Sequence, residues 1–151
     1  MNLQEELKAL KERIAELEEQ AKEEQEFPKM GDIYWRIDDR GSVDNCMYNN
    51  YYTDNHRQAI GNFFKTKEQA EFAVEKLKVE AELRKFSRPF EYGKFNYYLL
   101  FDIDGNNFRT DVTSYCPSQG AIYFESEEKA QQAISTVGED RIKKYIFGME
   151  D

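Results

Sequence analysis

The sequence predicts an α+β protein in which an N-terminal coiled-coil helix precedes two tandem β-β-β-α units with antiparallel sheets. Three observations lead to this fold class. Apolar residues recur at alternating spacings of four and three over the first 21 residues. From residue 32 onward, short aromatic and β-branched runs alternate with turn residues, as they do in strands. The segment FFKTKEQAEFAV at 63–74 then returns as YFESEEKAQQAI at 123–134, which indicates an internal repeat.

Region 1–26 has the pattern of a coiled-coil oligomerisation helix. Its apolar residues fill the seam of a heptad repeat, with Leu3, Leu10 and Leu17 at d positions and Leu7, Ile14 and Ala21 at a positions. This mixture suits two or three strands, and we expect a parallel dimer. The alternative is an amphipathic helix that folds back onto the body, but such a helix has a wider apolar face. The helix should end near Glu26, because Pro28 disfavours a helical residue before it.

Residues 30–87 should form the first β-β-β-α unit. We expect a hairpin from strands at 33–37 and 42–48, a polar loop at 49–59 and a third strand at 60–65.

The helix of this first unit should start at Lys67, because Thr66 and Gln69 form a capping box, and run to about Phe86. It has one stripe of small apolar residues and a second, larger stripe formed by Phe72, Val79, Leu83 and Phe86. This second stripe needs a partner.

Residues 95–151 should repeat the arrangement. Strands are expected at 97–101, 108–115 and 120–125, and Ser126 replaces Thr66 as the helix cap. Gly138 should end this helix, and a short helical piece follows.

Composition excludes several function classes. The chain has 151 residues, 40% of them hydrophobic, and a net charge of -9, which opposes binding to phosphate backbones. Cys46 and Cys116 stand alone, so neither a zinc site nor a disulfide framework is expected. No signal peptide or membrane span is predicted, and we expect a soluble, cytoplasmic protein.

No catalytic or cofactor motif is present, so we expect neither an enzyme nor a cofactor. His56 is the only histidine and lacks a nucleophile signature nearby. The run 102–106 starts like a calcium loop, but Asn107 stands where the turn glycine belongs and Thr113 where the bidentate Glu belongs. A hairpin turn is the better prediction.

Two segments are candidates for binding a partner. The first contains Tyr48, Tyr51 and Tyr52 among asparagines, a composition suited to protein contacts, although these rings could also pack on the sheet. The second is the basic and aromatic segment 84–98, with Arg84, Lys85, Arg88 and Lys94. That composition is typical of single-stranded nucleic-acid grooves. The simpler interpretation, which we favour, is that the segment connects the two units, with its rings buried between them and its basic side chains in solvent.

Blocks 61–86 (GNFFKTKEQAEFAVEKLKVEAELRKF) and 122–148 (IYFESEEKAQQAISTVGEDRIKKYIFG) resemble small proteins encoded by phages and prophages of Gram-positive bacteria. Those proteins also tend to begin with a coiled-coil-like helix. The resemblance implies a bacterial host cell as the setting and a host or phage protein as the partner, including CRISPR and other defence effectors.

The expected function is therefore that of a non-enzymatic, oligomeric protein-binding module, with an anti-CRISPR-like inhibitor as its sharpest version. The alternative is a nucleic-acid-binding protein that uses segment 84–98.

Overall fold

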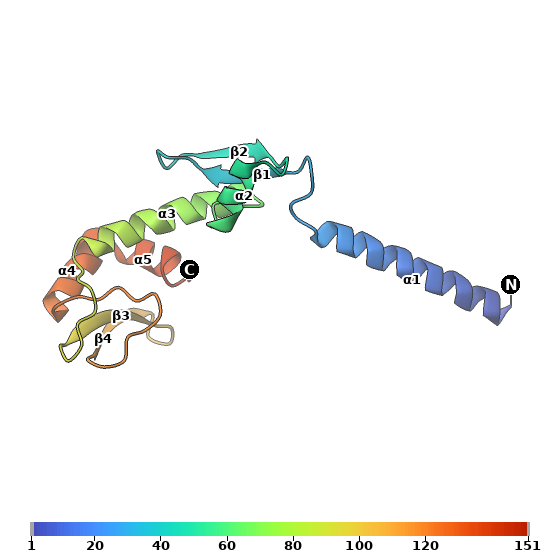
Figure 1. Ribbon diagram of the computed structural model, residues 1–151. Coiled ribbons are helices and arrows are strands. Elements are labelled where there is room, and N and C mark those ends of the chain that lie inside the picture. The colour runs from blue at the N-terminus through green and yellow to red at the C-terminus, as the bar shows by residue number, and fades with distance from the viewer. Residues whose placement is uncertain (1, 151) are drawn as a thin grey trace. The chain divides into compact units, whose positions relative to one another are not determined.

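The computed structural model describes residues 2–150, apart from the side chains of residues 23 and 25. Met1 and Asp151, the outer ends of two predicted domains, lie outside the described residues. The order of elements is a long helix, a hairpin, two helices, a second hairpin and two further helices (Figure 1). Both sheets are antiparallel and two-stranded. The predicted α+β class is confirmed.

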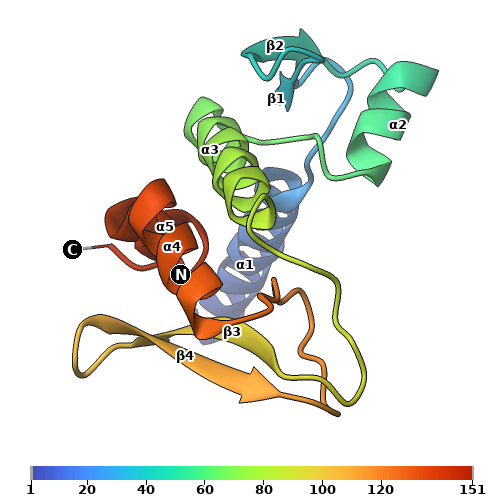
Figure 2. The ribbon, with the colours of Figure 1, turned by 90° about the vertical axis from the view of Figure 1, so that its left-hand side faces the viewer.

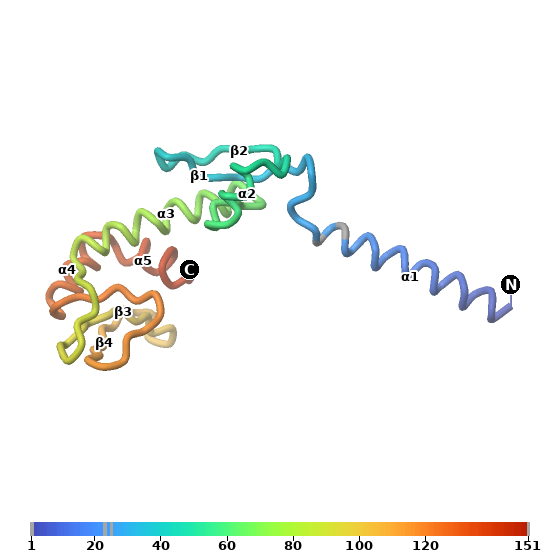
Figure 3. The backbone as a smooth tube through the Cα atoms, viewed as in Figure 1, coloured from blue at the N-terminus to red at the C-terminus, as the bar shows by residue number. Residues whose placement is uncertain are grey.

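The N-terminal helix α1 spans Leu3–Gln25 and carries the N-terminal end of the chain (Figure 3). Asn2 caps it, because its Oδ1 accepts the Glu5 N–H at 2.9 Å while the Glu5 carboxylate accepts the Asn2 N–H at 3.2 Å. The helix ends at Gln25, two residues before Phe27, with Glu26 in extended conformation at its C-terminal cap. The predicted end near Glu26 is confirmed.

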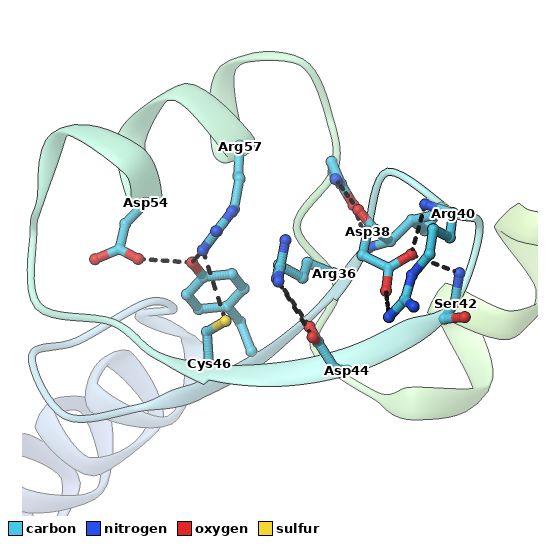
Figure 4. Close-up of polar contacts among 11 residues, drawn as sticks. Arg36, Asp38, Arg40, Ser42, Asp44, Cys46, Asp54 and Arg57 are labelled. Carbon is cyan, nitrogen blue, oxygen red and sulfur yellow. Dashed lines mark hydrogen bonds and ion pairs between the residues drawn. The ribbon is translucent and has the colours of Figure 1, made fainter.

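The first hairpin consists of β1 (Ile33–Ile37) and β2 (Val43–Met47). Asp38 holds the turn, since its Oδ1 accepts the N–H groups of Arg40 at 2.9 Å and Ser42 at 2.8 Å (Figure 4). Strand pairing places Tyr34 opposite Cys46 on one face of the hairpin. The predicted hairpin is confirmed.

The prediction of a polar loop at 49–59 was wrong, because helix α2 occupies Tyr52–Ala59. The start of this helix depends on Asp54, whose Oδ2 accepts the N–H groups of Asn49 at 3.0 Å and Tyr51 at 3.2 Å. A carboxylate at this position also interacts favourably with the positive end of the helix dipole. Asparagine and tyrosine have low helix propensity, and the tertiary contacts of Asp54 override it.

The predicted third strands are each reduced to isolated pairings. In the first unit, Trp35 and Phe64 exchange two backbone hydrogen bonds of 2.8 Å. The next position is completed by a side chain, since Asn62 accepts the Ile37 N–H at 2.6 Å and donates to the Ile37 carbonyl at 2.7 Å. A full strand at 60–65 was therefore wrong: Ile60 ends α2 and Gly61, with φ +79°, turns the chain.

In the second unit, the segment 120–125 was likewise wrong as a continuous strand. Phe124 pairs with Tyr97, and Tyr123 pairs with Arg88. Since antiparallel partners keep a constant register, Ile122 is the residue that would face Leu99, and it has no amide side chain. No hydrogen bond among the described residues joins Leu99 to a third strand.

This difference between the units gives a prediction for amide hydrogen exchange. The Ile37 N–H should exchange more slowly than the Leu99 N–H, because only the former is donated to a third segment. Replacing Asn62 with Ala should speed exchange at Ile37 and leave Trp35, which bonds to the backbone of Phe64, protected. Equal rates at Ile37 before and after the substitution would show that the amide does not protect this edge.

Helix α3 spans Lys67–Arg84, and Thr66 caps it as predicted, with its Oγ1 accepting the Gln69 N–H at 3.2 Å. The chain divides into two compact units, 1–70 and 71–151, so the boundary lies inside this helix. The sequence-based division had kept the whole helix with residues 30–87. Val79 and Leu83 account for the difference, because both are buried in the core of the second unit.

The second unit contains the hairpin β3 (Asn96–Asp102) and β4 (Asn107–Thr113) and helices α4 (Glu127–Val137) and α5 (Glu139–Tyr145). The helices lie over one face of the hairpin (Figure 2). Ser126 caps α4 through its Oγ, which accepts the Lys129 N–H at 3.1 Å, and Gly138 ends it with φ +105°. The core combines residues of α3, α4 and α5 with Phe124, and Tyr97, Leu99 and Phe108 pack against it.

Candidate binding surfaces

The heptad seam of α1 is a row of exposed apolar side chains. The exposed fractions of its side chains are 83% for Leu3, 52% for Leu7, 61% for Leu10, 54% for Ile14 and 46% for Leu17. A regular row of exposed leucines is unfavourable in water, because each of these side chains gains about 1.5–3 kcal/mol on full burial. The predicted oligomerisation residues thus lie together on an uncovered face.

A buried polar network joins α2 to the first hairpin (Figure 4). Tyr34, which is fully buried, donates its hydroxyl to Asp54 Oδ1 at 2.6 Å and accepts from Arg57 Nη1 at 2.8 Å. The same Arg57 nitrogen lies 3.6 Å from Cys46 Sγ. We call these four residues the Tyr34 network. Beside it, the Arg36 Nε lies 2.8 Å from Asp44 Oδ1.

The network shifts the pKa values of two of its members. Burial, and then the hydrogen bond to Asp54, raises the pKa of Tyr34 from 10.0 to about 12. The Tyr34 hydrogen bond, followed by the backbone N–H of Asn49, lowers the pKa of Asp54. At neutral pH the tyrosine is therefore protonated and the aspartate ionised, which is the state in which their hydrogen bond is strongest.

The Tyr34 network presents two tyrosines to solvent. Tyr51 and Tyr52 are 68% and 78% exposed, and the Tyr52 ring lies 3.9 Å from the His56 ring between centroids. Tyr48 does not join them: it is half-buried, with its ring edge against Phe63. We call Tyr51 and Tyr52 the tyrosine face. Of the three predicted tyrosines, the structure brings only these two to the surface.

The hydroxyl of Tyr34 gives a stability prediction. Tyr34→Phe should lower the free energy of unfolding by about 2 kcal/mol, because Asp54 loses a buried donor and Arg57 an acceptor. Urea denaturation measures this. Tyr98→Phe is the matched control, since its hydroxyl makes an exposed 3.4 Å contact, and it should cost less than about 0.5 kcal/mol. Equal losses in both variants would contradict a special role for the network.

The pH dependence follows from the same two groups. Because the pKa of folded Tyr34 is raised, its contribution to stability is fully present below pH 10 and is lost as the pH rises towards about 12. Because the pKa of Asp54 is lowered, its contribution is present above the ordinary value of 3.8 and is lost as the pH falls below it. Tyr34→Phe should therefore flatten the alkaline arm of a stability profile between pH 10 and 12. An unchanged alkaline arm would contradict the assignment.

A second buried network organises residues 88–96. Asn96 is fully buried; its Oδ1 accepts from Arg88 Nη1 at 2.6 Å and from the Glu91 N–H at 2.9 Å. Its Nδ2 donates to the carbonyls of Glu91 at 2.9 Å, Lys94 at 3.0 Å and Thr113 at 2.9 Å. We call this set the Asn96 network. One side-chain amide thus ties a loop to β4.

The Asn96 network supports three exposed rings. Tyr92, Phe95 and Tyr115 are 80%, 67% and 65% exposed, and the rings of Tyr92 and Tyr115 meet edge to face at 5.1 Å. Gly93, with φ +79°, donates its N–H to the Ser114 carbonyl at 2.9 Å and so fixes the loop beside Tyr115. We call these rings the aromatic patch. The sequence analysis did not mark Tyr115 for binding, because it placed this residue at the end of the predicted strand 108–115.

The predicted basic residues separate into two groups. Arg84, Lys85 and Lys94 are exposed. Arg88 instead directs its guanidinium inward, with Nη1 on Asn96 Oδ1 and Nη2 on the Phe95 carbonyl at 2.8 Å. Its role is in holding the loop.

The run 102–106, which starts like a calcium loop, forms a turn. Asp102 Oδ1 accepts the Gly105 N–H at 3.2 Å, which is the predicted hairpin turn. Among the side chains that the structure describes in residues 2–150, no three His, Cys, Asp or Glu gather in a group that could hold a metal ion. Within the same range, no helix is both long and apolar enough to cross a bilayer.

Comparisons with protein-family models, with curated proteins and with solved structures find no match to this chain. The function is therefore argued from its own surfaces.

Proposed function

We propose that this chain is a non-enzymatic protein-binding module that works as an oligomer, with a homodimer favoured. Residues 1–26 join the copies, and the tyrosine face and the aromatic patch contact the partner protein. The single observation that carries the proposal is the uncovered seam of α1, in which five leucine and isoleucine side chains are 46–83% exposed in the isolated chain.

The partner surfaces have the composition of protein-contact sites. Tyrosine and phenylalanine bring large area at a low cost in rotamer entropy, and they are enriched where proteins bind proteins. Each surface is held by buried hydrogen bonds, so little ordering entropy is lost on binding. Exposed rings that are already held in place favour the binding of a partner protein.

The narrower form of the proposal is an anti-defence role against a host effector such as a CRISPR nuclease. It is supported by the resemblance of residues 61–86 and 122–148 to phage proteins. Expression of the full chain in a Gram-positive host with active CRISPR immunity should raise the plaque count of a targeted phage. An unchanged plaque count would remove this narrower form and leave the binding module.

The module itself is tested by mass and by capture. Sedimentation of the full chain should give a dimer, and removal of residues 1–26 should give a monomer. Capture of a host protein by the full chain should be lost when Tyr92 and Tyr115 are replaced with Ala, while Tyr98→Phe retains it. A full chain with monomeric mass would overturn the proposal.

The alternative function is binding of single-stranded nucleic acid. Its candidate side chains Arg84, Lys85 and Lys94 are exposed, but Arg88 is engaged by protein oxygens. Binding of an oligonucleotide that weakens steeply with added salt would favour this rival. The net charge of -9 predicts no binding at low salt.

A further inference from the structure

The seam of α1 is flanked by charged side chains, and their order along the helix favours one orientation of a second helix over the other. In the heptad assignment, the residues flanking the seam are Gln4, Lys11 and Glu18 at e positions and Glu6, Arg13 and Gln20 at g positions. In a coiled coil, the side chains at e and g positions of one helix lie beside those of the second helix. Their charges determine which helices pair and in which orientation. The e and g charges of α1 therefore meet different partners in a parallel and in an antiparallel pair.

In a parallel pair without a shift, each g residue lies beside the e residue of the next heptad on the other helix. Glu6 then meets Lys11 of the second copy, and Arg13 meets Glu18 of the second copy. Each contact occurs twice because of the twofold symmetry. Every charged pair in this arrangement is attractive.

In an antiparallel pair with full overlap, e residues lie beside e residues and g residues beside g residues. Lys11 would meet its own counterpart in the second copy, and so would Arg13. Both contacts repel. A shift by one heptad avoids them but leaves part of the exposed seam uncovered, and the seam is only about three heptads long.

Within one chain, Arg13 has an alternative contact that is weak. Its Nη1 lies 3.3 Å from Glu16 Oε2, and the two side chains are 61% and 65% exposed. An exposed pair of this kind contributes little and is screened by salt. Arg13 can therefore turn to Glu18 of the second copy at small cost.

We propose that α1 pairs with a second copy of this chain in parallel and in register, and that the contacts Glu6–Lys11 and Arg13–Glu18 between the two helices determine this arrangement. The inference rests on the proposed function and adds its geometry. Both chains leave the coil at Gln25 at the same end. In both chains, the segments that carry the tyrosine face and the aromatic patch continue from this same end of the coiled coil. This arrangement allows bivalent binding.

Charge exchange tests the register on the full chain. Lys11→Glu places Glu6 beside a second carboxylate and should weaken dimerisation about tenfold. Lys8→Glu is the matched control, because it makes the same change outside the e and g positions, and it should have a smaller effect. Adding Glu6→Lys to Lys11→Glu should restore the dimer to within about threefold of the native chain. This is a stringent rescue, since Glu6 also lies in the first helical turn, where a lysine is unfavourable.

Cysteine pairing tests the orientation. In a full chain with Cys46→Ser and Cys116→Ser, we place cysteine by Leu3→Cys in one sample and by Ala21→Cys in another. When the two are mixed and oxidised, a parallel pair gives disulfides only between like positions. An antiparallel pair brings the two different positions together and joins unlike chains, since like positions are then about 27 Å apart along the helix.

The outcomes separate the inference from the proposed function. A native chain that sediments as a monomer overturns both. A dimer with disulfides between unlike positions, or one in which Glu6→Lys does not rescue Lys11→Glu, overturns the parallel register alone. A dimer with like-position disulfides and full rescue supports the inference.

Discussion

Replacing Leu10 with Asp is expected to convert the proposed dimer into a monomer. Leu10 lies at the middle of the seam and is 61% exposed in the isolated chain, so its burial depends on the second helix. The substitution removes an apolar side chain from each copy and places a charge at the interface, which should weaken association at least about 100-fold. Sedimentation equilibrium at micromolar concentration measures the change in mass.

The control for this substitution is Ala9→Asp. It adds the same charge on the same turn at an exposed position outside the seam, and it should leave the mass unchanged. If the Leu10→Asp variant had the same dimeric mass as the native chain, the seam would not be the surface that joins the copies. In that case the exposed leucines would belong to contacts with another protein.

Replacing Asn96 with Ala is expected to destabilise the second unit by about 3 kcal/mol or more. The side chain makes five hydrogen-bond contacts from a fully buried position, and its loss leaves the Glu91 N–H, three carbonyls and the Arg88 guanidinium without their partner. Urea denaturation measures the loss. Asn107→Ala, at an exposed position of the same hairpin, should cost less than about 0.5 kcal/mol.

Asn96→Asp sharpens the same test. A carboxylate still accepts from Arg88 and from the Glu91 N–H, but it cannot donate to the carbonyls of Lys94 and Thr113, and it adds a buried charge. The loss should therefore be at least as large as in Asn96→Ala. A mild effect of both changes would show that the loop 88–96 is held by other contacts.

The two polar networks perform the same task in the two units. In each, a buried side chain with several hydrogen bonds fixes a short connection and leaves aromatic rings on its outside: Tyr34 for Tyr51 and Tyr52, and Asn96 for Tyr92 and Phe95. Loops that present binding residues are commonly held by a rigid scaffold in this way. Under the proposed function, loss of either network should weaken partner binding beyond its effect on stability.

Local signals were sufficient wherever short-range physical chemistry decides the conformation. The heptad spacing defines α1, turn residues define both hairpins, and Thr66 and Ser126 start the two repeated helices. Each of these features depends on neighbours within a few residues, which is why a single sequence predicts it.

Only the tertiary structure decided the rest, because those features depend on partners far along the chain. Helix α2 forms where a loop was predicted, since Asp54 is held by Tyr34, twenty residues earlier. Helix α3 contributes two buried side chains to the core of the second unit. The predicted third strands are reduced to isolated pairings. In the first unit, the side chain of Asn62 takes the place of the next backbone partner. Arg88 turns inward to Asn96, so a residue that composition marked for binding supports a loop. The seam of α1 is determined by the sequence, because its spacing is that of a heptad repeat, and its side chains are 46–83% exposed in the isolated chain.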